Sequence, residues 1–544
     1  MKTSFIFTFL ILVTLATKPA FSAGEIKPGS LDSLANAVGL SSPAIPDRAK
    51  LRPLKIAILD NGFSGFVAAL GNTIPSGTQL RKGPIAVDPK TEEGHGLKIA
   101  EIFSNLMDRT EVQYDLHLFQ AFGYSNLQSA IDTAIIEKFD LILYSQVWEY
   151  GGNGDGQGFI NALVSNATSK GITWVNASGN FGKSTYRAAI SRKTDDWAAL
   201  PGPNNSVQIR CAKNEGGVCH LRVVLTWNSF SNDVNAGTDK DLDLVLTDDI
   251  LTVVQTAGLK QKTSVRAGET GVSLYPREIV EADVKPGLYY IRAKMRSQNF
   301  TSTDELRITS SGDFTEMINR TEGETLLAPA DNSSVITIGA FDSDMSGLSR
   351  KLLRPDLSAI SLIETDDGAQ FKGSSNSAAA YAARIAFEIS KHTSVDRPYL
   401  DRAAILQVAR GGSARPLPPV ASPPPAPSQP AANASRGLAS TTGACYVYIA
   451  LPLTTPEAHK MLRDGGSAVA TVTGNKVFIE ENPFVRAARL GIPVNGLTQG
   501  LSNVILAADV SGFFAVPLSR RKDLGRDAVE FVQAPQGASY CPIR

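Results

Sequence analysis

Four short motifs supply a carboxylate, an imidazole, an amide and a hydroxyl in one chain. Asp60 follows a buried apolar run, His95 precedes a stretch with helical periodicity, Asn180 follows a second apolar run, and Ser375 opens an alanine-rich stretch. A serine hydroxyl becomes an effective nucleophile when an imidazole removes its proton, and a carboxylate can orient that imidazole. The residue types therefore indicate nucleophilic catalysis by serine, with an amide available to stabilise a developing oxyanion.

These side chains need a scaffold, and the hydrophobic pattern predicts one. Short apolar runs alternate with stretches of helical periodicity up to about residue 200, and the alternation returns after residue 335. Fully apolar strands separated by helices are typical of a parallel sheet covered on both faces. Asp60 would end a strand and Ser375 would begin a helix, which is where such sheets build sites. The expected strands are 56–59, 141–144, 172–175 and 335–340, and the expected helices are 96–107, 159–170 and 378–386.

The chain between residues 203 and 326 has a different pattern. Short runs with partial two-residue alternation, at 221–227, 241–246 and 288–292, predict strands without intervening helices. Short strands at this spacing favour a small β-sandwich. We therefore expect an all-β sandwich inserted into the α/β domain, since an exposed loop whose ends lie close together tolerates an insertion.

Both ends of the chain differ from this core. Residues 1–23 combine Lys2, an apolar run and small residues before the expected cleavage point, which is typical of a secretory signal peptide. Residues 24–54 form a polar N-terminal extension without strong periodicity. The proline-rich stretch 411–436 predicts a linker, and residues 437–544 predict a separate small α+β domain in which the sequence shows no chemistry.

Charge and cysteine content limit the possible partners. The chain has 544 residues, with 53 basic and 53 acidic side chains, so no positive surplus indicates a nucleic-acid partner. After the first two dozen residues, no segment is long and apolar enough to predict a transmembrane span. Four cysteines fit an exported protein with up to two disulfides, and three pairings are possible. Cys211 and Cys219 could close a small loop, and Cys445 and Cys541 could close the last segment.

The motifs together resemble those of the subtilisin-like (subtilase) serine proteases, over residues 55–200 and about 327–390. The order Asp, His, Ser is that of the subtilisin triad and differs from the orders in chymotrypsin and the α/β-hydrolases. The matching motifs are Leu59-Asp60-Asn61-Gly62, Gly94-His95-Gly96-Leu97, Asn176-Ala177-Ser178-Gly179-Asn180, Ala328-Pro329-Ala330, Arg354-Pro355-Asp356-Leu357 and Phe371-Lys372-Gly373-Ser374-Ser375.

The resemblance implies a subtilisin-like peptidase domain formed by residues 55–202 and 327–410. It implies a secreted or periplasmic serine endopeptidase that acts on protein or peptide substrates. The implied roles are Ser375 as nucleophile, His95 as general base, Asp60 as the carboxylate that orients the base, and Asn180 as an oxyanion donor. Ser145 and Gly179 would border the peptide-binding cleft.

Several positions depart from the family pattern. Leu97 replaces the usual Thr after His-Gly, Glu101 replaces a small Gly, Ser374 replaces Thr, and Ala379 replaces Pro. None of these changes removes a catalytic atom. The drift also fits an alternative function, a catalytically weakened subtilase-like protein that acts in binding or as a scaffold. An α/β-hydrolase esterase does not fit, because the triad order differs and a Gly-x-Ser-x-Gly elbow is missing.

No cofactor is required for this chemistry, and no catalytic metal is expected. Asp239, Asp241 and Asp243 form a possible structural calcium cluster, because Ca²⁺ takes several carboxylate ligands. We favour the simpler interpretation that they alternate on the solvent face of a sandwich strand.

Overall fold

A computed structural model describes residues 25–43, 51–87, 94–214, 216–266, 268–391 and 401–410, together with short strands between residues 471 and 533. The expected signal peptide, the expected linker and most of residues 437–544 lie outside the described residues. Cys445 and Cys541 lie outside them as well. The expected architecture of the C-terminal segment therefore stays a prediction.

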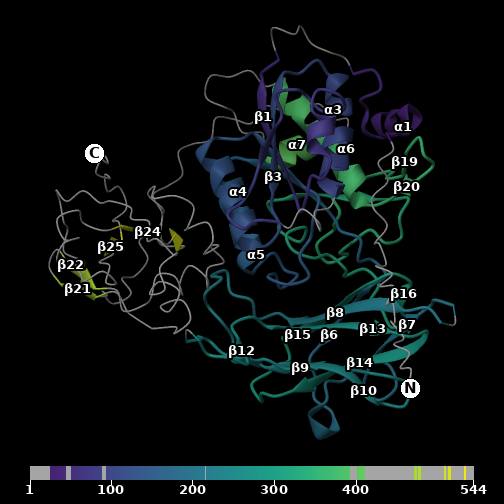
Figure 1. Cartoon of the computed structure of the whole chain (residues 1–544), viewed down its shortest axis with the longest axis vertical. Helices are drawn as coiled ribbons and strands as arrows, with labels where there is room; N and C mark the ends of the chain where they lie inside the picture. Colours follow the sequence, from purple (N-terminus) through teal and green to yellow (C-terminus); the bar gives the residue numbers. More distant parts are fainter. Residues whose placement is uncertain are drawn as a thin grey trace, which may run out of the picture.

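A seven-stranded sheet forms the centre of the α/β domain (Figure 1). Its strand order is β18-β17-β5-β4-β1-β3-β2, and all of its strand pairs are parallel. The apolar runs expected as strands form its centre, and the predicted fold class, a parallel α/β sheet with an all-β insert, is confirmed. The strands are β1 (Leu54–Asp60), β2 (Gln79–Arg81), β3 (Tyr114–Gln120), β4 (Leu141–Tyr144), β5 (Thr173–Ala177), β17 (Ile336–Ala340) and β18 (Leu357–Ala359).

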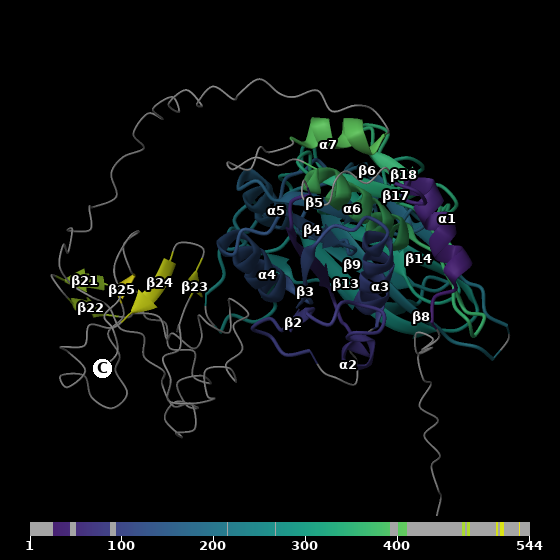
Figure 2. The same cartoon turned by 90° about the horizontal axis from the view of Figure 1, so that it is seen from above.

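Helices cover both faces of the sheet (Figures 1 and 2). Ile56 and Ile58 of β1 pack in one core with α1, α3, α6 and α7, whereas Ala57 and Leu59 pack in a second core with α4 and α5. This division follows from the alternation of side chains along a strand, and it explains why β1 is apolar on both sides. The helices are α1 (Pro28–Val38), α2 (Phe66–Ala69), α3 (His95–Asp108), α4 (Tyr124–Ile136), α5 (Phe159–Ser169), α6 (Ser374–Ser390) and α7 (Arg402–Ala409).

Helix α6 runs through the middle of the first core. Every one of its residues except Arg384 is buried, because it packs against the sheet on one side and against α1, α3 and α7 on the others. Small alanine and serine side chains allow these close contacts. A helix enclosed in this way needs no polar face.

Helix α1 lies within the stretch expected to be a polar extension. It buries Leu31, Leu34, Ala35 and Val38 against the first core. Those positions have helical spacing, with Pro at the helix start and Gly39 in the left-handed conformation at its end, which are ordinary helix boundaries. Helix α1 is therefore part of the α/β domain core.

The insert is a sandwich of two sheets (Figure 1). One sheet has the order β10-β9-β14-β7-β16 and the other β13-β8-β15-β6, with antiparallel pairs throughout. A disulfide between Cys211 and Cys219 connects β7 with β8, and therefore one sheet with the other. The strands are β6 (Thr185–Ala189), β7 (Val207–Cys211), β8 (Cys219–Trp227), β9 (Leu242–Thr247), β10 (Val253–Ala257), β13 (Arg277–Val284), β14 (Gly287–Met295), β15 (Glu305–Ser311) and β16 (Thr315–Met317).

The sandwich begins earlier than the expected boundary at residue 203. Strand β6 pairs with β15, and Ile190, Ala198 and Leu200 belong to the sandwich core. The chain therefore passes from the α/β domain into the insert near residue 184.

Short elements complete the described chain. They are the 3-10 helix η2 (Thr194–Asp196), the pair β11 (Lys260–Gln261) and β12 (Val272–Ser273), the hairpin β19 (Ile363–Glu364) and β20 (Gln370–Phe371), and the C-terminal strands β21 (Thr471–Thr473), β22 (Lys476–Phe478), β23 (Ala508–Asp509), β24 (Gly512–Ala515) and β25 (Val532–Gln533). Among the described residues, no helix combines the length and the apolar character needed to cross a bilayer.

Candidate active site

Asp60 is the last residue of β1 and is fully buried. Its Oδ2 atom lies 2.9 Å from Nδ1 of His95 and also accepts a hydrogen bond from the Ser145 hydroxyl. Its Oδ1 atom accepts hydrogen bonds from the Asn61 N–H, at 2.8 Å, and from Nε2 of Gln146, at 3.1 Å. Both carboxylate oxygens are therefore held in place by donors.

These contacts keep Asp60 ionised despite its burial. Burial alone raises the pKa of the carboxyl, but the charge and hydrogen bond of His95, with the hydrogen bonds from Ser145 and the backbone, outweigh it. The pKa of Asp60 is therefore below its ordinary value. A carboxylate in this state can hold the Nδ1 proton of an imidazole and stabilise its positive form.

His95 is the first residue of α3, and Gly96 allows that helix to approach Asp60. A methyl group on Gly96 would come within 2.6 Å of Cβ of Asp60 and 2.7 Å of the Gly62 carbonyl oxygen. Only glycine fits this approach. The Gly96 N–H also donates to the Gly62 carbonyl at 3.1 Å, which ties the helix start to the end of β1.

Ser375 lies in the first turn of α6. Its hydroxyl donates to the carbonyl oxygen of Ser145 at 3.2 Å. Ser145 follows β4, which is the neighbour of β1 in the sheet. Ser145 therefore contacts Asp60 through its side chain and Ser375 through its backbone, and it brings the predicted site residues together.

Asn180 and Gly179 lie beside the start of α6. Oδ1 of Asn180 accepts hydrogen bonds from the N–H and the hydroxyl of Ser374, at 3.1 and 3.3 Å. A methyl group on Gly373 would lie 2.9 Å from Nδ2 and 3.2 Å from Oδ1 of Asn180, so the whole side-chain amide lies beside this turn. Gly179 has a φ of 81°, and its Cα faces the Val147 side chain.

The position of these residues follows from the order of the sheet. Strand β1 lies between β3 and β4, and the chain winds outward from it in both directions. In open parallel sheets, sites form at the carboxyl ends of strands where the winding reverses. Asp60 ends β1, and Ser145 follows the neighbouring β4, so both lie at this point.

Gln146 was not among the residues expected from the sequence. Besides its contact with Asp60, its Nε2 atom lies 3.3 Å from Nδ1 of His95. A glutamine after a strand carries no sequence signal for such a role. The contact depends on β1, β4 and α3 meeting in space.

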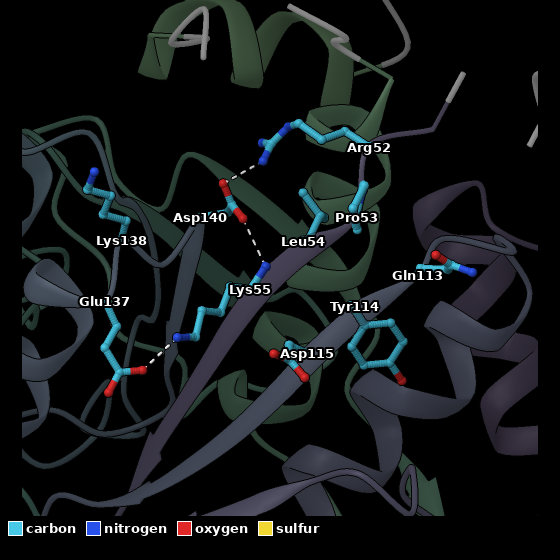
Figure 3. A pocket seen from close by; sticks show the side chains of 10 residues that line it. All are labelled: Arg52, Pro53, Leu54, Lys55, Gln113, Tyr114, Asp115, Glu137, Lys138 and Asp140. Atoms are coloured by element: carbon cyan, nitrogen blue, oxygen red, sulfur yellow. Dashed lines mark hydrogen bonds and ion pairs between the residues drawn. The ribbon is translucent and has the colours of Figure 1, made fainter. Parts of the chain in front are cut away.

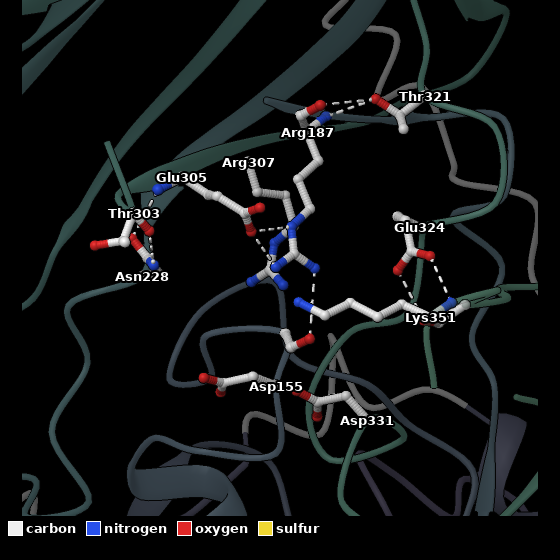
Figure 4. A network of polar contacts seen from close by, with 12 residues as sticks. Asp155, Arg187, Asn228, Thr303, Glu305, Arg307, Thr321, Glu324, Asp331 and Lys351 are labelled. Carbon is white, nitrogen blue, oxygen red and sulfur yellow. Dashed lines mark hydrogen bonds and ion pairs between the residues drawn. The ribbon is translucent and has the colours of Figure 1, made fainter. Parts of the chain in front are cut away.

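The segment that follows, residues 148–158, is held by the insert. Arg307 of β15 is buried, and its Nη2 atom donates to the carbonyl oxygens of Glu149 and Gly152, at 3.0 and 3.3 Å. Arg187 of β6 donates to the Gly154 carbonyl at 3.4 Å and pairs with Glu305 (Figure 4). The Glu149 carboxylate accepts from the Arg222 guanidinium of β8. The insert therefore fixes a segment that starts a few residues from Ser145.

A second polar region lies at the opposite edge of the sheet (Figure 3). A pocket of about 350 Å³ is lined by the starts of β1 and β3 and the turn before β4. Its charges are paired, Arg52 with Asp140 and Lys55 with Glu137. Since the pocket is at the amino ends of the strands, we assign it no part in the chemistry at Asp60.

The aspartates considered for calcium do not form the expected solvent-facing row. Asp241 is buried, and Asp243 is paired with Arg296. Burial, with the nearby charge of Asp243, raises the pKa of Asp241 to about 6. In the described part of the chain, no three His, Cys, Asp or Glu side chains form a group that could hold a metal ion.

Comparison with known proteins adds information at the level of the fold. No protein-family model matches the chain, and no curated protein sequence does. Solved structures of three proteases are similar to parts of this chain. The Clostridium perfringens CspB protease is 13% identical, with 71% of this chain and 93% of that protein covered and a TM-score of 0.42.

Two further solved structures are more distant. The epidermin leader peptide processing serine protease EpiP from Staphylococcus aureus is 12% identical, with 66% of this chain and 78% of that protein covered and a TM-score of 0.28. A lanthipeptide protease is 17% identical, with 28% of this chain and 47% of that protein covered and a TM-score of 0.20. These similarities concern the fold alone.

Proposed function

We propose that this chain is a serine endopeptidase with Asp60, His95 and Ser375 as its catalytic triad and Asn180 as a side-chain oxyanion donor. The observation that carries the proposal is the double contact of Ser145. Its hydroxyl donates to the Asp60 carboxylate that faces His95, and its carbonyl accepts from the Ser375 hydroxyl. Asp60, Ser145 and Ser375 come from distant parts of the chain, and the two contacts of Ser145 connect them.

The proposed reaction begins when the Ser375 hydroxyl turns from the Ser145 carbonyl toward His95. As the serine oxygen attacks the scissile carbonyl carbon, His95 accepts the hydroxyl proton, and Asp60 stabilises the imidazolium. His95 then gives this proton to the leaving amine, the C–N bond breaks and an acyl-enzyme remains. A water molecule, deprotonated by His95, releases the acid and restores Ser375.

The oxyanion of the tetrahedral intermediates needs donors placed in advance. Nδ2 of Asn180 lies beside the turn that carries Ser375. The N–H of Ser375 lies in the first turn of α6, where backbone N–H groups lack a carbonyl partner within the helix. We propose these two donors, with Ser145 and Gly179 bordering the cleft that binds an extended protein or peptide substrate.

We also propose that the chain works outside the cytoplasm. The Cys211–Cys219 disulfide supports this location, because such bonds persist in oxidising compartments. It agrees with the expected signal peptide at residues 1–23, whose role stays part of the proposal. The proposed division is a peptidase domain that comprises helix α1, residues 55 to near 184 and residues 327 to 410, interrupted by the sandwich.

Labelling with a fluorophosphonate probe tests this function. We expect wild-type protein to be labelled and Ser375→Ala to lose the label, with peptide hydrolysis lower on the order of 10⁴-fold or more. Ser377→Ala is the matched control. Its hydroxyl donates to the Ala359 and Ile360 carbonyls, so this variant should keep the label.

The outcomes separate the two candidate functions. If labelling survives Ser375→Ala but is lost in Ser374→Ala, the nucleophile would be assigned to Ser374 instead of Ser375. Folded wild-type protein that takes no label and cleaves no unfolded protein substrate would refute the peptidase. It would favour the weakened scaffold protein instead.

A further inference from the structure

The side chain of Gln146 contacts the Asp60–His95 pair at Oδ1 of Asp60, whereas Ser145 donates to Oδ2. The Gln146 Nε2 atom lies 3.1 Å from Oδ1 of Asp60 and 3.3 Å from Nδ1 of His95. Its backbone carbonyl accepts a hydrogen bond from Nδ2 of Asn176 at 3.1 Å, which fixes the main chain at this residue. The amide is therefore presented from a constrained position.

The hydrogen bonds around Asp60 decide which atom accepts from the Gln146 amide. Nδ1 of His95 donates to Oδ2 of Asp60, so that nitrogen cannot also accept from Gln146. The Gln146 N–H therefore goes to Oδ1 of Asp60, where it joins the Asn61 N–H. With Oδ1 held by two donors, the carboxylate cannot rotate away from the imidazole.

We propose that Gln146 is a positioning residue that fixes the Asp60 carboxylate and sets the basicity of His95. This inference rests on the proposed peptidase function. A neutral donor beside Asp60 spreads part of the carboxylate charge into the hydrogen bond. His95 then holds its proton less tightly than it would beside a carboxylate without that donor.

The described residues that shift the pKa of Asp60 differ in charge. Among the residues that shift the pKa of Asp60, His95 is the charged one, while Ser145 and Asn61 act as neutral donors. The Tyr144 phenol, on β4, is influenced in turn by the Asp60 charge, and burial is the main cause that raises its pKa. Gln146 itself does not titrate, so replacing it by a matched apolar or acidic residue changes one interaction at a time.

Two substitutions at this position test the inference. Gln146→Met has similar length and removes the donor, and Gln146→Glu replaces the amide by a carboxylate of the same shape. Gln157→Met and Gln157→Glu are controls, because Gln157 is an exposed residue of the same segment. The readouts are the histidine ring signals in an NMR titration of the full chain and the pH dependence of fluorophosphonate labelling.

We expect the titration midpoint of His95 to be lowest in wild type, higher in Gln146→Met and highest in Gln146→Glu, where it should lie about one pH unit or more above wild type. The acid limb of the labelling rate should move by the same amount, and the rate near pH 7 should fall about tenfold in Gln146→Glu. A side chain with only a structural role would lower the rate without this order. Midpoints that move no more than in the Gln157 controls would overturn the inference.

The two proposals fail in different ways. The NMR midpoint of His95 is measured without turnover. If no variant and no wild-type protein takes the label, the peptidase proposal fails, and the order of midpoints still decides the role of Gln146. If wild type takes the label but the midpoints do not follow the substitutions of Gln146, only the Gln146 proposal fails.

Discussion

Asn180 is oriented through its amide oxygen. Oδ1 accepts from both the N–H and the hydroxyl of Ser374, and Nδ2 lies beside Gly373 at the start of α6. A donor fixed in advance costs no reorganisation when charge develops in the transition state. The orientation of one amide is therefore worth testing by itself.

We expect Asn180→Ala to lower kcat on the order of 10²–10³-fold while KM changes by only a few-fold. The lost N–H would have served the oxyanion and not the ground-state substrate. Steady-state kinetics on a peptide substrate measures both values, with Ser377→Ala as the control that removes a nearby hydroxyl whose acceptors are the Ala359 and Ile360 carbonyls. A rise in KM at constant kcat would assign Asn180 to substrate binding instead.

The sequence points to single residues when a motif accompanies them. Asp60, His95, Ser145 and Ser375 are indicated by their order and their flanking residues. In the structure, Asp60 contacts His95 and Ser145, and Ser375 contacts Ser145. Gln146 could not be found in this way, because a half-buried glutamine after a strand is common. Its contacts exist only because α3 and β4 meet at the end of β1.

At the scale of elements, side chains of β15 and β6 of the insert donate hydrogen bonds to the segment 148–158. Arg307 is the central contact, and burial lowers the pKa of its guanidinium to about 10, so it remains charged at neutral pH. It donates to two backbone carbonyls of a glycine-rich segment. The insert therefore contributes to the rigidity of the chain that leaves the proposed cleft.

We expect Arg307→Met to destabilise the protein by about 3 kcal/mol, because two buried carbonyls lose their charged donor. Amide hydrogen exchange should increase mainly in residues 148–158. Arg210→Met is the control, since Arg210 forms an exposed pair with Glu316 whose loss should cost less than about 1 kcal/mol. Exchange that rises equally across the whole sandwich would show that Arg307 stabilises the insert and not this segment.

The elements themselves were largely predictable. Apolar runs such as 56–59 and 141–144 became strands, and 96–107 became α3, since their periodicity reflects burial. Strand β6 was missed because a half-buried edge strand has little pattern before its partner β15 is known. The spacing of Leu31, Leu34 and Val38 indicates helix α1. The polar residues between them hide this periodicity.

At the scale of the whole molecule, the stability of the chain depends on carboxyl groups far from the proposed active site. Glu278 of β13 is buried and accepts hydrogen bonds from the Leu259 N–H and from Nε2 of Gln261, both at 2.9 Å. Burial raises its pKa to about 7, and the nearby Asp243 and Asp241 add to this effect. The folded insert therefore prefers the protonated form.

The sign of the pH dependence follows from this preference. Unfolded Glu278 would lose its proton near its ordinary pKa, whereas the folded chain keeps it up to about pH 7. The free energy of unfolding therefore falls as pH rises through this window, and the loss is complete above it. Glu278→Gln should remove this loss and stabilise the insert by about 2 kcal/mol at pH 8, with little effect at pH 4.

Urea unfolding at the two pH values, followed by the fluorescence of the buried Trp227 of β8, measures this difference. Glu281→Gln is a suitable control, because Glu281 lies on the same strand but is exposed. Equal losses of stability in wild type and Glu278→Gln between pH 4 and pH 8 would contradict the prediction.

The overall architecture could be predicted from the sequence because burial leaves a pattern of apolar residues. A parallel sheet buried on both faces leaves continuous apolar runs, and a sandwich leaves alternating ones. The environment of Asp241 was not accessible, because a short Asp-Leu-Asp repeat looks the same whether its acids face solvent or the interior. Only the neighbouring Glu278 and Gln261, distant in sequence, reveal that Asp241 is buried.

The enclosure of α6 has a consequence for how this molecule could be altered. The helix that presents Ser375 touches the core on every side, so evolution or a designer can scarcely shift the hydroxyl without rebuilding the centre of the domain. Ser145 and Gly179 lie after strand ends, and exposed residues near them, such as Asn180 and Gln157, are less enclosed than those of α6. New selectivity should therefore arise by changing what surrounds the proposed nucleophile, and libraries confined to exposed residues beyond the strand ends should retain folded variants at a much higher rate than libraries in α6.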